Sequence, residues 1–319
     1  MAKPLFQGAI TDVHGIRVGQ AQDTRALTGV TVVLCGGEGA VVGADSRGAA
    51  TGTREMILTR SEATVEKANA VMLTGGSAYG LDAAGGVMRF LEEAGIGYEV
   101  GSYYVPIVPA AVLFDLMVGD GRVRPDAAMG YEACKNAKKT LQQGGFGAGT
   151  GATIGKLVPG TQPVFGGTGA ASITLTDGVT VGAVDCVNAC GDVYHPHTGK
   201  VLACGRLGDG KPVTSEGLLF GTTPAAEHLK IPQSGNTTLV VVATDAIITK
   251  PQANRIAICA HDGMARAIRP VHTQMDGDTV FALATGRVNT DVNMIRLCAA
   301  AAEVTARAVA NAAYIGGKR

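Results

Sequence analysis

The sequence is poor in charge. Lys, Arg, Asp and Glu make up 17% of the 319 residues, below the ~25% usual for soluble proteins, and the formal net charge is zero. No basic patch or tail stands out, which argues against nucleic acid or an anionic membrane surface as a partner. No run approaches the roughly 18 apolar residues of a membrane-spanning helix, and the first residues lack the apolar core of a signal peptide.

Paired cysteines and clustered metal ligands are also missing. The seven cysteines are odd in number and scattered, and Cys186 and Cys190 have no second close pair to complete a zinc site. His195 and His197 lack an evident third ligand, so a surface turn is favoured over a metal site. We therefore expect reduced, mostly buried thiols in a cytoplasmic protein that uses neither a metal nor a cofactor.

Glycine, by contrast, is abundant. The 46 glycines are about twice the average frequency, and they cluster in short turns without the period of a collagen or a repeat protein. The richest segment, 144–156, fails as a phosphate-binding P-loop, because Thr150 stands where its first glycine should be and Leu157 follows Lys156. Its loose dinucleotide-binding spacing follows a predicted helix rather than a strand. Two interpretations stay open: a glycine-lined cleft into which Lys156 reaches, or a solvated surface lysine.

The pattern of apolar residues predicts sheets covered by helices. No Pro/Ser-rich linker divides the chain, so we expect a single domain over residues 1–319. The polar loop 222–236 is the favoured place for a boundary within it and for an internal cleavage. An Asp177-Gly178 turn is expected to join two paired strands. Strands are predicted at 30–35, 39–44, 70–74, 172–176, 179–187 and 278–283, and helices at 81–93, 126–143, 256–267 and 297–312.

The stretch from Ser234 to Ala246 carries the most chemical information. A polar turn ends at Asn236, Thr237 and Thr238 follow, and an apolar strand then begins. If the Asn236–Thr237 bond were cut, Thr237 would carry both a hydroxyl nucleophile and a free α-amine. That amine has a reference pKa near ~7.7–8.0, so it can accept a proton close to neutral pH. Residue types alone equally suit an ordinary threonine at the start of a strand.

Three further polar residues suit a site of this kind. Asp276 and Asp278 enter an apolar strand, and two such carboxylates can shift each other's pKa and orient an amine or hydroxyl. The same Asp-Gly-Asp sequence also suits a hairpin turn. Asn188 follows a strand and can donate its amide to an oxyanion, although a loop asparagine is more often a turn former.

Taken together and in order, several segments resemble the DmpA-type L-aminopeptidase/D-esterase family. The resemblance runs from about Ile10 to the C-terminus and extends to the β-peptidyl aminopeptidases and the nylon-oligomer (6-aminohexanoate oligomer) endo-hydrolases of that family. The matching segments are Gly-Gly-Ser-Ala-Tyr-Gly at 75–80, Val-Pro-Ile-Val-Pro-Ala-Ala at 105–111, Gly-Ala-Gly-Thr-Gly-Ala at 147–152, the run 236–246, and Asp-Gly-Asp-Thr-Val-Phe-Ala-Leu-Ala-Thr-Gly at 276–286.

The resemblance implies a four-layer α-β-β-α sandwich, the fold shared with the ornithine acetyltransferases. It implies self-cleavage into an α chain, 1–236, and a β chain, 237–319, that stay together. Thr237 then matches the nucleophile, and the supporting residues of the nylon-oligomer branch match Lys156, Asn188, Asp276 and Asp278. Aminopeptidase members have a serine nucleophile and Ser-x-Glu where this chain has Asp276 and Asp278, a departure that favours amidase activity. Phe114 is the candidate for the position of the family's oxyanion tyrosine.

The expected activity is hydrolysis of small linear amides or peptides through an acyl-Thr237 intermediate. The resemblance also implies that the αβ units form a homotetramer. Short peptides, β-amino-acid amides and 6-aminohexanoate oligomers are the candidate substrates. The alternative is an acyltransferase resembling ornithine acetyltransferase, in which an amine rather than water accepts the acyl group. A third interpretation is a binding or structural protein that never matures.

The first prediction concerns maturation. Purified protein should show two masses, the second equal to the segment from Thr237 to Arg319, because the Thr237 hydroxyl attacks the preceding carbonyl. The Thr237→Ala variant should stay one chain, as checked by intact-mass analysis. Cleavage of that variant at the same bond would exclude Thr237 as the attacking group.

Overall fold

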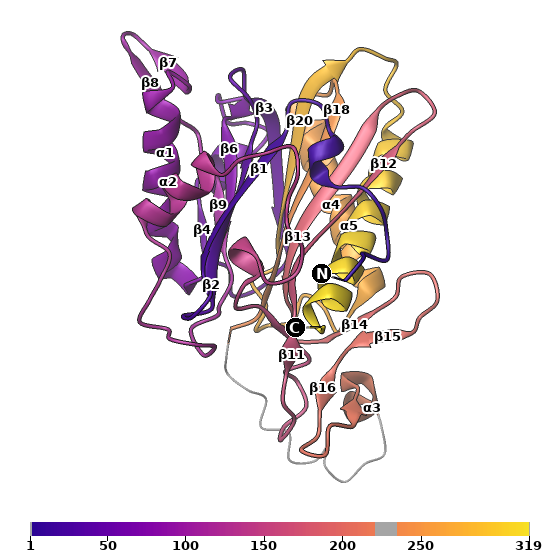
Figure 1. The fold of residues 1–319 in the computed structure, drawn as a ribbon. Helices are drawn as coiled ribbons and strands as arrows, with labels where there is room; N and C mark the ends of the chain where they lie inside the picture. The colour runs from indigo at the N-terminus through magenta and orange to yellow at the C-terminus, as the bar shows by residue number, and fades with distance from the viewer. Residues whose placement is uncertain (1, 221–234, 319) are drawn as a thin grey trace.

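The computed structural model describes residues 2–220 and 235–318, which form two sheets lying face to face with helices on both outer sides (Figure 1). The first sheet has the strand order β1-β2-β6-β9-β4, in which β6 and β9 are parallel and the other pairs antiparallel. Its strands are β1 (Arg17–Asp23), β2 (Thr28–Leu34), β6 (Ala70–Thr74), β9 (Ala110–Val112) and β4 (Thr53–Arg54).

The second sheet has the order β12-β13-β18-β20-β3-β5, with β18 and β20 parallel and the other neighbours antiparallel. Every residue of β13 and β18 is buried, as expected for central strands covered on both faces. Its strands are β12 (Gly167–Thr174), β13 (Thr180–Asn188), β18 (Thr237–Ala246), β20 (Thr279–Val288), β3 (Ala40–Ser46) and β5 (Lys67–Ala68).

Helices cover the outer face of each sheet, and three apolar clusters fill the spaces between the four layers. One cluster joins α1 and α2 to the first sheet, a second lies between the sheets, and a third joins α4 and α5 to the second sheet. This arrangement confirms the predicted α-β-β-α sandwich. The helices are α1 (Ala83–Glu93), α2 (Ala127–Lys135), α3 (Ser215–Leu219), α4 (Lys250–Ala267) and α5 (Met294–Gly316).

Shorter elements decorate this framework. The β7–β8 hairpin extends beyond α1, and the small sheets near α3 lie at the end of the sandwich where the described chain breaks off (Figure 1). They are β7 (Tyr98–Val100), β8 (Tyr103–Val105), β10 (Thr153–Ile154), β11 (Val164–Phe165), β14 (Asp192–Tyr194), β15 (Val201–Ala203), β16 (Gly205–Arg206), β17 (Pro212–Val213) and β19 (Ile268–Arg269), with 3-10 turns η1 (Ile10–Asp12), η2 (Met56–Thr59), η3 (Ser77–Asp82) and η4 (Gly147–Gly149).

Most predicted elements are present, with ends displaced by a few residues. The Asp177-Gly178 turn joins β12 to β13, where Thr174 pairs with Thr180 and Gly178 has a φ of +86°. The polar loop predicted as a boundary at 222–236 lies outside the described residues except for Gly235 and Asn236. No helix in the described ranges combines the length and apolar character that crossing a bilayer requires.

The helix predicted over 126–143 is wrong in its second half, because α2 ends at Lys135. Beyond it the backbone finds partners along the edge of β1. Lys138 exchanges two 3.0 Å hydrogen bonds with Val18, and the amide of the Gln20 side chain bonds the N–H and C=O of Gln142 at 2.9 and 3.0 Å. These bonds satisfy the backbone as well as a further helical turn would. The glycine-rich segment therefore does not follow a helix directly.

The close approach of α5 to β12 depends on Gly169. A Cβ at this position would lie 2.0 Å from the carbonyl oxygen of Ala308 and 2.5 Å from the amide nitrogen of Ala312. Gly169→Ala should lower the free energy of unfolding by about 1–3 kcal/mol, because a helix must shift to admit the methyl group. Thermal and denaturant unfolding measure this change.

The matched control is Gly85→Ala in α1, where an added Cβ meets nothing within 4 Å. This substitution should raise stability by about 0.5–1 kcal/mol, because alanine favours a helix over glycine. If Gly169→Ala were as stable as the original protein, α5 would not be held against β12 as tightly as the structure shows.

Candidate active site

Three neighbouring strands bring the predicted site residues to one edge of the second sheet. Because β18 and β20 are parallel, their first residues lie at the same edge, and the antiparallel β13 ends there. Asn188, the last residue of β13, is paired with Thr237, the first residue of β18. Asn236 forms an isolated parallel bridge with Asp276, just before β20.

Thr237 lies against the peptide bond that its hydroxyl is predicted to attack. The residue is 3% exposed, and its Oγ donates a 2.5 Å hydrogen bond to the carbonyl oxygen of Asn236. The same carbonyl oxygen accepts a 2.8 Å hydrogen bond from the N–H of Gly277. Negative charge that developed on this oxygen would therefore already face a donor.

Position 277 has room for glycine but not for a residue with a Cβ atom. A Cβ there would lie 2.7 Å from Thr237 Oγ and 2.8 Å from the carbonyl oxygen of Ala50. The Asp-Gly-Asp sequence therefore combines two functions: its carboxylates bond the surrounding backbone, and its glycine leaves room for the hydroxyl. Sequence reasoning assigned roles to both carboxylates and none to this glycine.

The two carboxylates hold backbone near Thr237 and show no hydrogen bond to Thr237 itself within the described residues. Asp278 is 1% exposed, and its Oδ1 accepts a 2.7 Å bond from the N–H of Thr238. Asp276 accepts bonds of 2.8 and 2.6 Å from the backbone and hydroxyl of Thr273. Burial, and then the charge of Asp278, raise the pKa of Asp276 to about 6 against the opposing effect of the Thr273 bonds.

Lys156, two residues after β10, bonds Asn188 through its side chain. Its ammonium group donates to Oδ1 of Asn188 at 2.8 Å and to the carbonyl oxygen at 3.0 Å. Burial lowers the pKa of Lys156 from its usual 10.5 to about 7, although the charges of Asp276 and Asp278 act in the opposite direction. A large share of this lysine is therefore uncharged near neutral pH.

Asn188 is fully buried and bonded on both ends of its amide. Oδ1 also accepts a 3.0 Å bond from the N–H of Thr153, and Nδ2 donates a 2.9 Å bond to the carbonyl oxygen of Phe114. One hydrogen of the amide is thus committed to Phe114, so a bond to an oxyanion needs the second. The structure brings all five predicted residues together, with Lys156 joined to the others through Asn188.

A cavity of about 260 Å³ opens onto Thr237. Uncharged residues make up its described lining, and Ser77 stands out because it adopts a left-handed backbone with a φ of +53°. Asp115 holds this turn by accepting a 2.7 Å bond from the N–H of Gly76. The described lining is Ala50, Thr51, Gly52, Ser77, Ala78, Val112, Leu113, Phe114, Gly235, Asn236 and Thr237.

Comparison with known protein families matches almost the whole chain. The sequence matches peptidase family S58 over residues 8–317. The chain belongs to this family. An S58 peptidase is a hydrolase that acts on peptide or amide bonds, and the resemblance drawn from the sequence motifs is confirmed.

Relatives of this S58 peptidase carry two kinds of name. It is 46% identical over 292 residues to the uncharacterized aminopeptidase Rv1333 of Mycobacterium tuberculosis, covering 88% of this chain and 82% of that protein. It is 32% identical over 315 residues to the 6-aminohexanoate-oligomer endohydrolase of Kocuria sp., covering 95% of this chain and 85% of the relative.

Solved structures agree on the fold. The L-aminopeptidase D-Ala-esterase/amidase of Ochrobactrum anthropi, described as a variant of the Ntn hydrolase fold, superposes with a TM-score of 0.69 at 20% identity. A Burkholderia sp. beta-aminopeptidase gives 0.66 at 25% identity. Each comparison covers 98% of this chain and 88% of the other chain.

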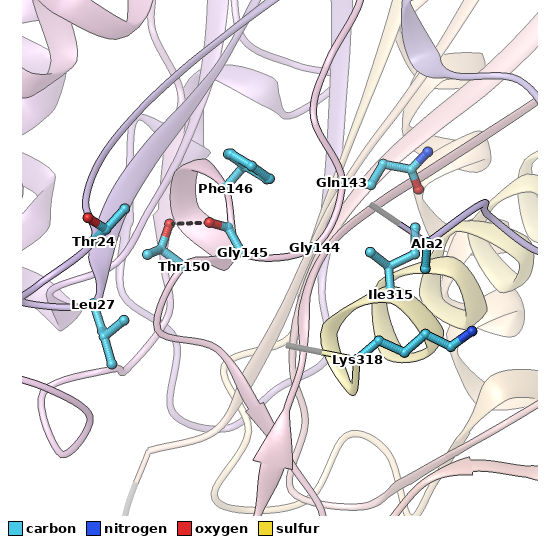
Figure 2. A pocket seen from close by; sticks show the side chains of 10 residues that line it. All are labelled: Ala2, Thr24, Leu27, Gln143, Gly144, Gly145, Phe146, Thr150, Ile315 and Lys318. Atoms are coloured by element: carbon cyan, nitrogen blue, oxygen red, sulfur yellow. Dashed lines mark hydrogen bonds between the residues drawn. The ribbon is translucent and has the colours of Figure 1, made fainter.

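The described lining of the Thr237 cavity contains no residue of the glycine-rich segment 144–156. Added Cβ atoms at Gly149, Gly151 and Gly155 would lie 2.0–2.2 Å from backbone atoms of neighbouring segments, so these glycines permit close backbone packing. The first part of the segment lines a separate hollow of about 350 Å³. Figure 2 shows Gly144 to Phe146 and Thr150 there, opposite Ile315 and Lys318. The described linings of this hollow and the Thr237 cavity share no residue.

His195 and His197 lie in a surface turn after β14, as predicted. The ring of His195 accepts a 3.2 Å bond from the N–H of His197, whose own ring contacts Glu303 at 2.6 Å. Sequence reasoning missed Ser77, Gly277 and His272, which contacts Asp278 at 2.8 Å. A left-handed backbone at a serine or histidine leaves no mark in the sequence, and only the Asp-Gly-Asp pattern offered a signal for Gly277.

The shifted pKa of Lys156 gives a prediction for stability. Between pH 7 and about 10.5 the unfolded chain holds one more proton at this lysine than the folded protein does, so folding becomes more favourable as pH rises. Below pH 7 both states are protonated and the full cost of burying the charge is present. Lys156→Met should therefore gain most stability relative to the original protein at pH 6 and least at pH 10.

Denaturant unfolding of both proteins at the two pH values measures this difference. The lost bond to Asn188 changes stability at both pH values, so the dependence on pH is the informative quantity. An unchanged difference between pH 6 and pH 10 would contradict a lowered pKa.

Proposed function

We propose that the protein cleaves itself between Asn236 and Thr237 and then hydrolyses amide bonds with Thr237 as an N-terminal nucleophile. The observation that supports this most directly is the position of the Thr237 hydroxyl against the Asn236 carbonyl, with the Gly277 N–H bonded to the same oxygen. The groups proposed as nucleophile, scissile carbonyl and oxyanion donor therefore lie together in the intact chain, which supports the proposal.

Self-cleavage would begin with attack of Thr237 Oγ on the carbonyl carbon of Asn236. The C–N bond breaks as the Thr237 nitrogen takes a proton, which leaves an ester between Asn236 and Oγ and a free α-amine. Water then hydrolyses the ester and releases the carboxylate of Asn236. The new β chain begins in the middle of the second sheet, where its strands β18 and β20 pair with β13 and β3 of the α chain, so the two chains would remain associated.

Turnover would repeat this chemistry on a substrate. The α-amine of Thr237 takes the hydroxyl proton while Oγ attacks the substrate carbonyl, the amine product leaves, and water hydrolyses the acyl-Thr237 ester. Lys156 can support the site because its pKa near 7 lets it donate or accept a proton close to neutral pH. The second amide hydrogen of Asn188 and the Gly277 N–H are the proposed oxyanion donors.

The proposed substrates are short linear amides. Two observations support them over longer proteins: the cavity of about 260 Å³ is small, and its described lining carries no charge. The relatives named as 6-aminohexanoate-oligomer endohydrolases and aminopeptidases make nylon oligomers, β-amino-acid amides and short peptides the substrates to test. The cytoplasmic location and the homotetramer of αβ units remain predictions from the sequence and the family resemblance.

The experiment uses the mature protein with a panel of 6-aminohexanoate oligomers, β-alanyl amides and L-amino-acid amides, and a slowly hydrolysed ester. We expect amide turnover with a burst, and an acyl group mapped by mass spectrometry to Thr237. Acylation at a cysteine, or no turnover of any amide, would contradict the proposal. Acyl transfer to ornithine without net hydrolysis would favour the acyltransferase alternative.

Gly277→Ala tests the geometry of the nucleophile. The added methyl group would lie 2.7 Å from Thr237 Oγ, so self-cleavage should slow by roughly 10²-fold or more as the hydroxyl and the oxyanion donor are displaced. The control is Gly37→Ala, where an added Cβ meets nothing within 4 Å and maturation should be unchanged. Equal maturation of both variants would show that Gly277 does not shape the site.

A further inference from the structure

A partly buried histidine, His272, contacts the carboxylate of Asp278, the same group that accepts the N–H of Thr238. Oδ1 of Asp278 accepts the N–H of Thr238 at 2.7 Å, while Oδ2 accepts the backbone N–H of His272 at 3.1 Å and contacts its Nδ1 at 2.8 Å. An ionised carboxylate can only accept, so this contact calls for the tautomer of His272 with a proton on Nδ1. One residue therefore supplies two of the donors that satisfy the buried carboxylate.

His272 is held from behind by a second histidine. The rings of His272 and His261 meet edge to face with their centres 4.7 Å apart, and His261 is fully buried in α4. Nε2 of His261 lies 3.2 Å from the carbonyl oxygen and 3.5 Å from the carboxylate of Asp45 in β3, which also binds Arg47 at 3.1 Å. Burial, and then His272, lower the pKa of His261 to about 4, so it is neutral at pH 7.

The charged and titratable groups around this pair are therefore Asp278, Asp45 and Arg47. They connect three elements, since Asp45 belongs to β3, His261 to α4 and Asp278 to the entry of β20. His272 itself has a left-handed backbone with a φ of +56°, which places the N–H and the ring nitrogen of one residue on the same carboxylate oxygen. Such a conformation is uncommon for a residue other than glycine and is found where surrounding contacts enforce it.

We infer that His272 is a positioning residue of the Thr237 site: it orients Asp278, which fixes the Thr237–Thr238 peptide, and His261 holds the imidazole in place. This inference rests on the proposed function. After cleavage Thr237 is the first residue of its chain, so its placement depends on the following peptide and on the pairing of β18. A carboxylate that rotated away from Thr238 would release one of these anchors.

The experiment compares two substitutions at position 272. His272→Gly keeps the left-handed backbone and removes the ring donor, so self-cleavage and kcat should fall by about 10²-fold while KM changes little, because a misplaced nucleophile slows the chemical step. Added imidazole should restore much of the rate by occupying the vacated space. His272→Asn should retain most of the rate, since its amide can donate to Asp278 and asparagine tolerates this backbone.

The matched control is His197→Gly, which removes a different histidine from a different carboxylate, Glu303, on the surface. It should leave maturation and kcat unchanged. His261→Ala leaves the His272–Asp278 contact and removes the supporting ring, so it should slow both reactions to a smaller degree. If His272→Gly fails to fold, as judged by thermal unfolding, the Asn variant and His261→Ala still decide the matter.

Two results would overturn the inference. The first is a folded His272→Gly protein that matures and turns over substrate like the original. The second is an Asn variant as slow as the Gly variant, together with no response to imidazole, which would indicate a role in folding alone. Failure of the proposed function looks different, because the original protein itself would then stay uncut and Thr237→Ala would change nothing.

Discussion

The pairing of β18 between β13 and β20 is the constraint on which the site depends. It places residues that are far apart in the sequence at one edge of a sheet: the end of β13 and the starts of β18 and β20. The parallel pairing of β18 and β20 is decisive, because an antiparallel pair would put the Asp-Gly-Asp segment at the opposite edge from Thr237. Gly277 then reaches the Asn236 carbonyl through its backbone alone.

Burying polar groups at this edge disfavours their charged forms. Some of these groups have pKa values shifted toward the neutral form, and Asp278 is stabilised by several hydrogen-bond donors. Lys156 has a pKa near 7, Asp276 near 6 and His261 near 4, each displaced toward the neutral form chiefly by loss of water. Asp278 instead collects donors from Thr238 and His272. Lys156 and Asp276, with pKa values near neutrality at the strand edge that carries Thr237, suit the proton transfers of the proposed function.

Much of the fold could be predicted from the pattern of apolar residues. The buried strands β2, β6, β13 and β18 are short apolar runs, and α1, α4 and α5 repeat apolar residues at helical spacing. The false second half of the helix predicted over 126–143 shows the limit of such patterns. Residues 136–143 suit a helix locally, yet they bond the edge of β1, a partner more than a hundred positions earlier.

The sequence by itself determined the family, the α-β-β-α sandwich and the choice of candidate site residues, because these follow from local patterns and from motifs in a fixed order. Only the tertiary structure decided what each residue contacts. It directed the Asn188 amide toward Phe114 and Asp278 toward Thr238 and His272, and it placed a glycine N–H on the Asn236 carbonyl. The reason is physical: hydrogen-bond direction, burial and strand pairing arise between segments distant in sequence, and no local pattern of residue types encodes them.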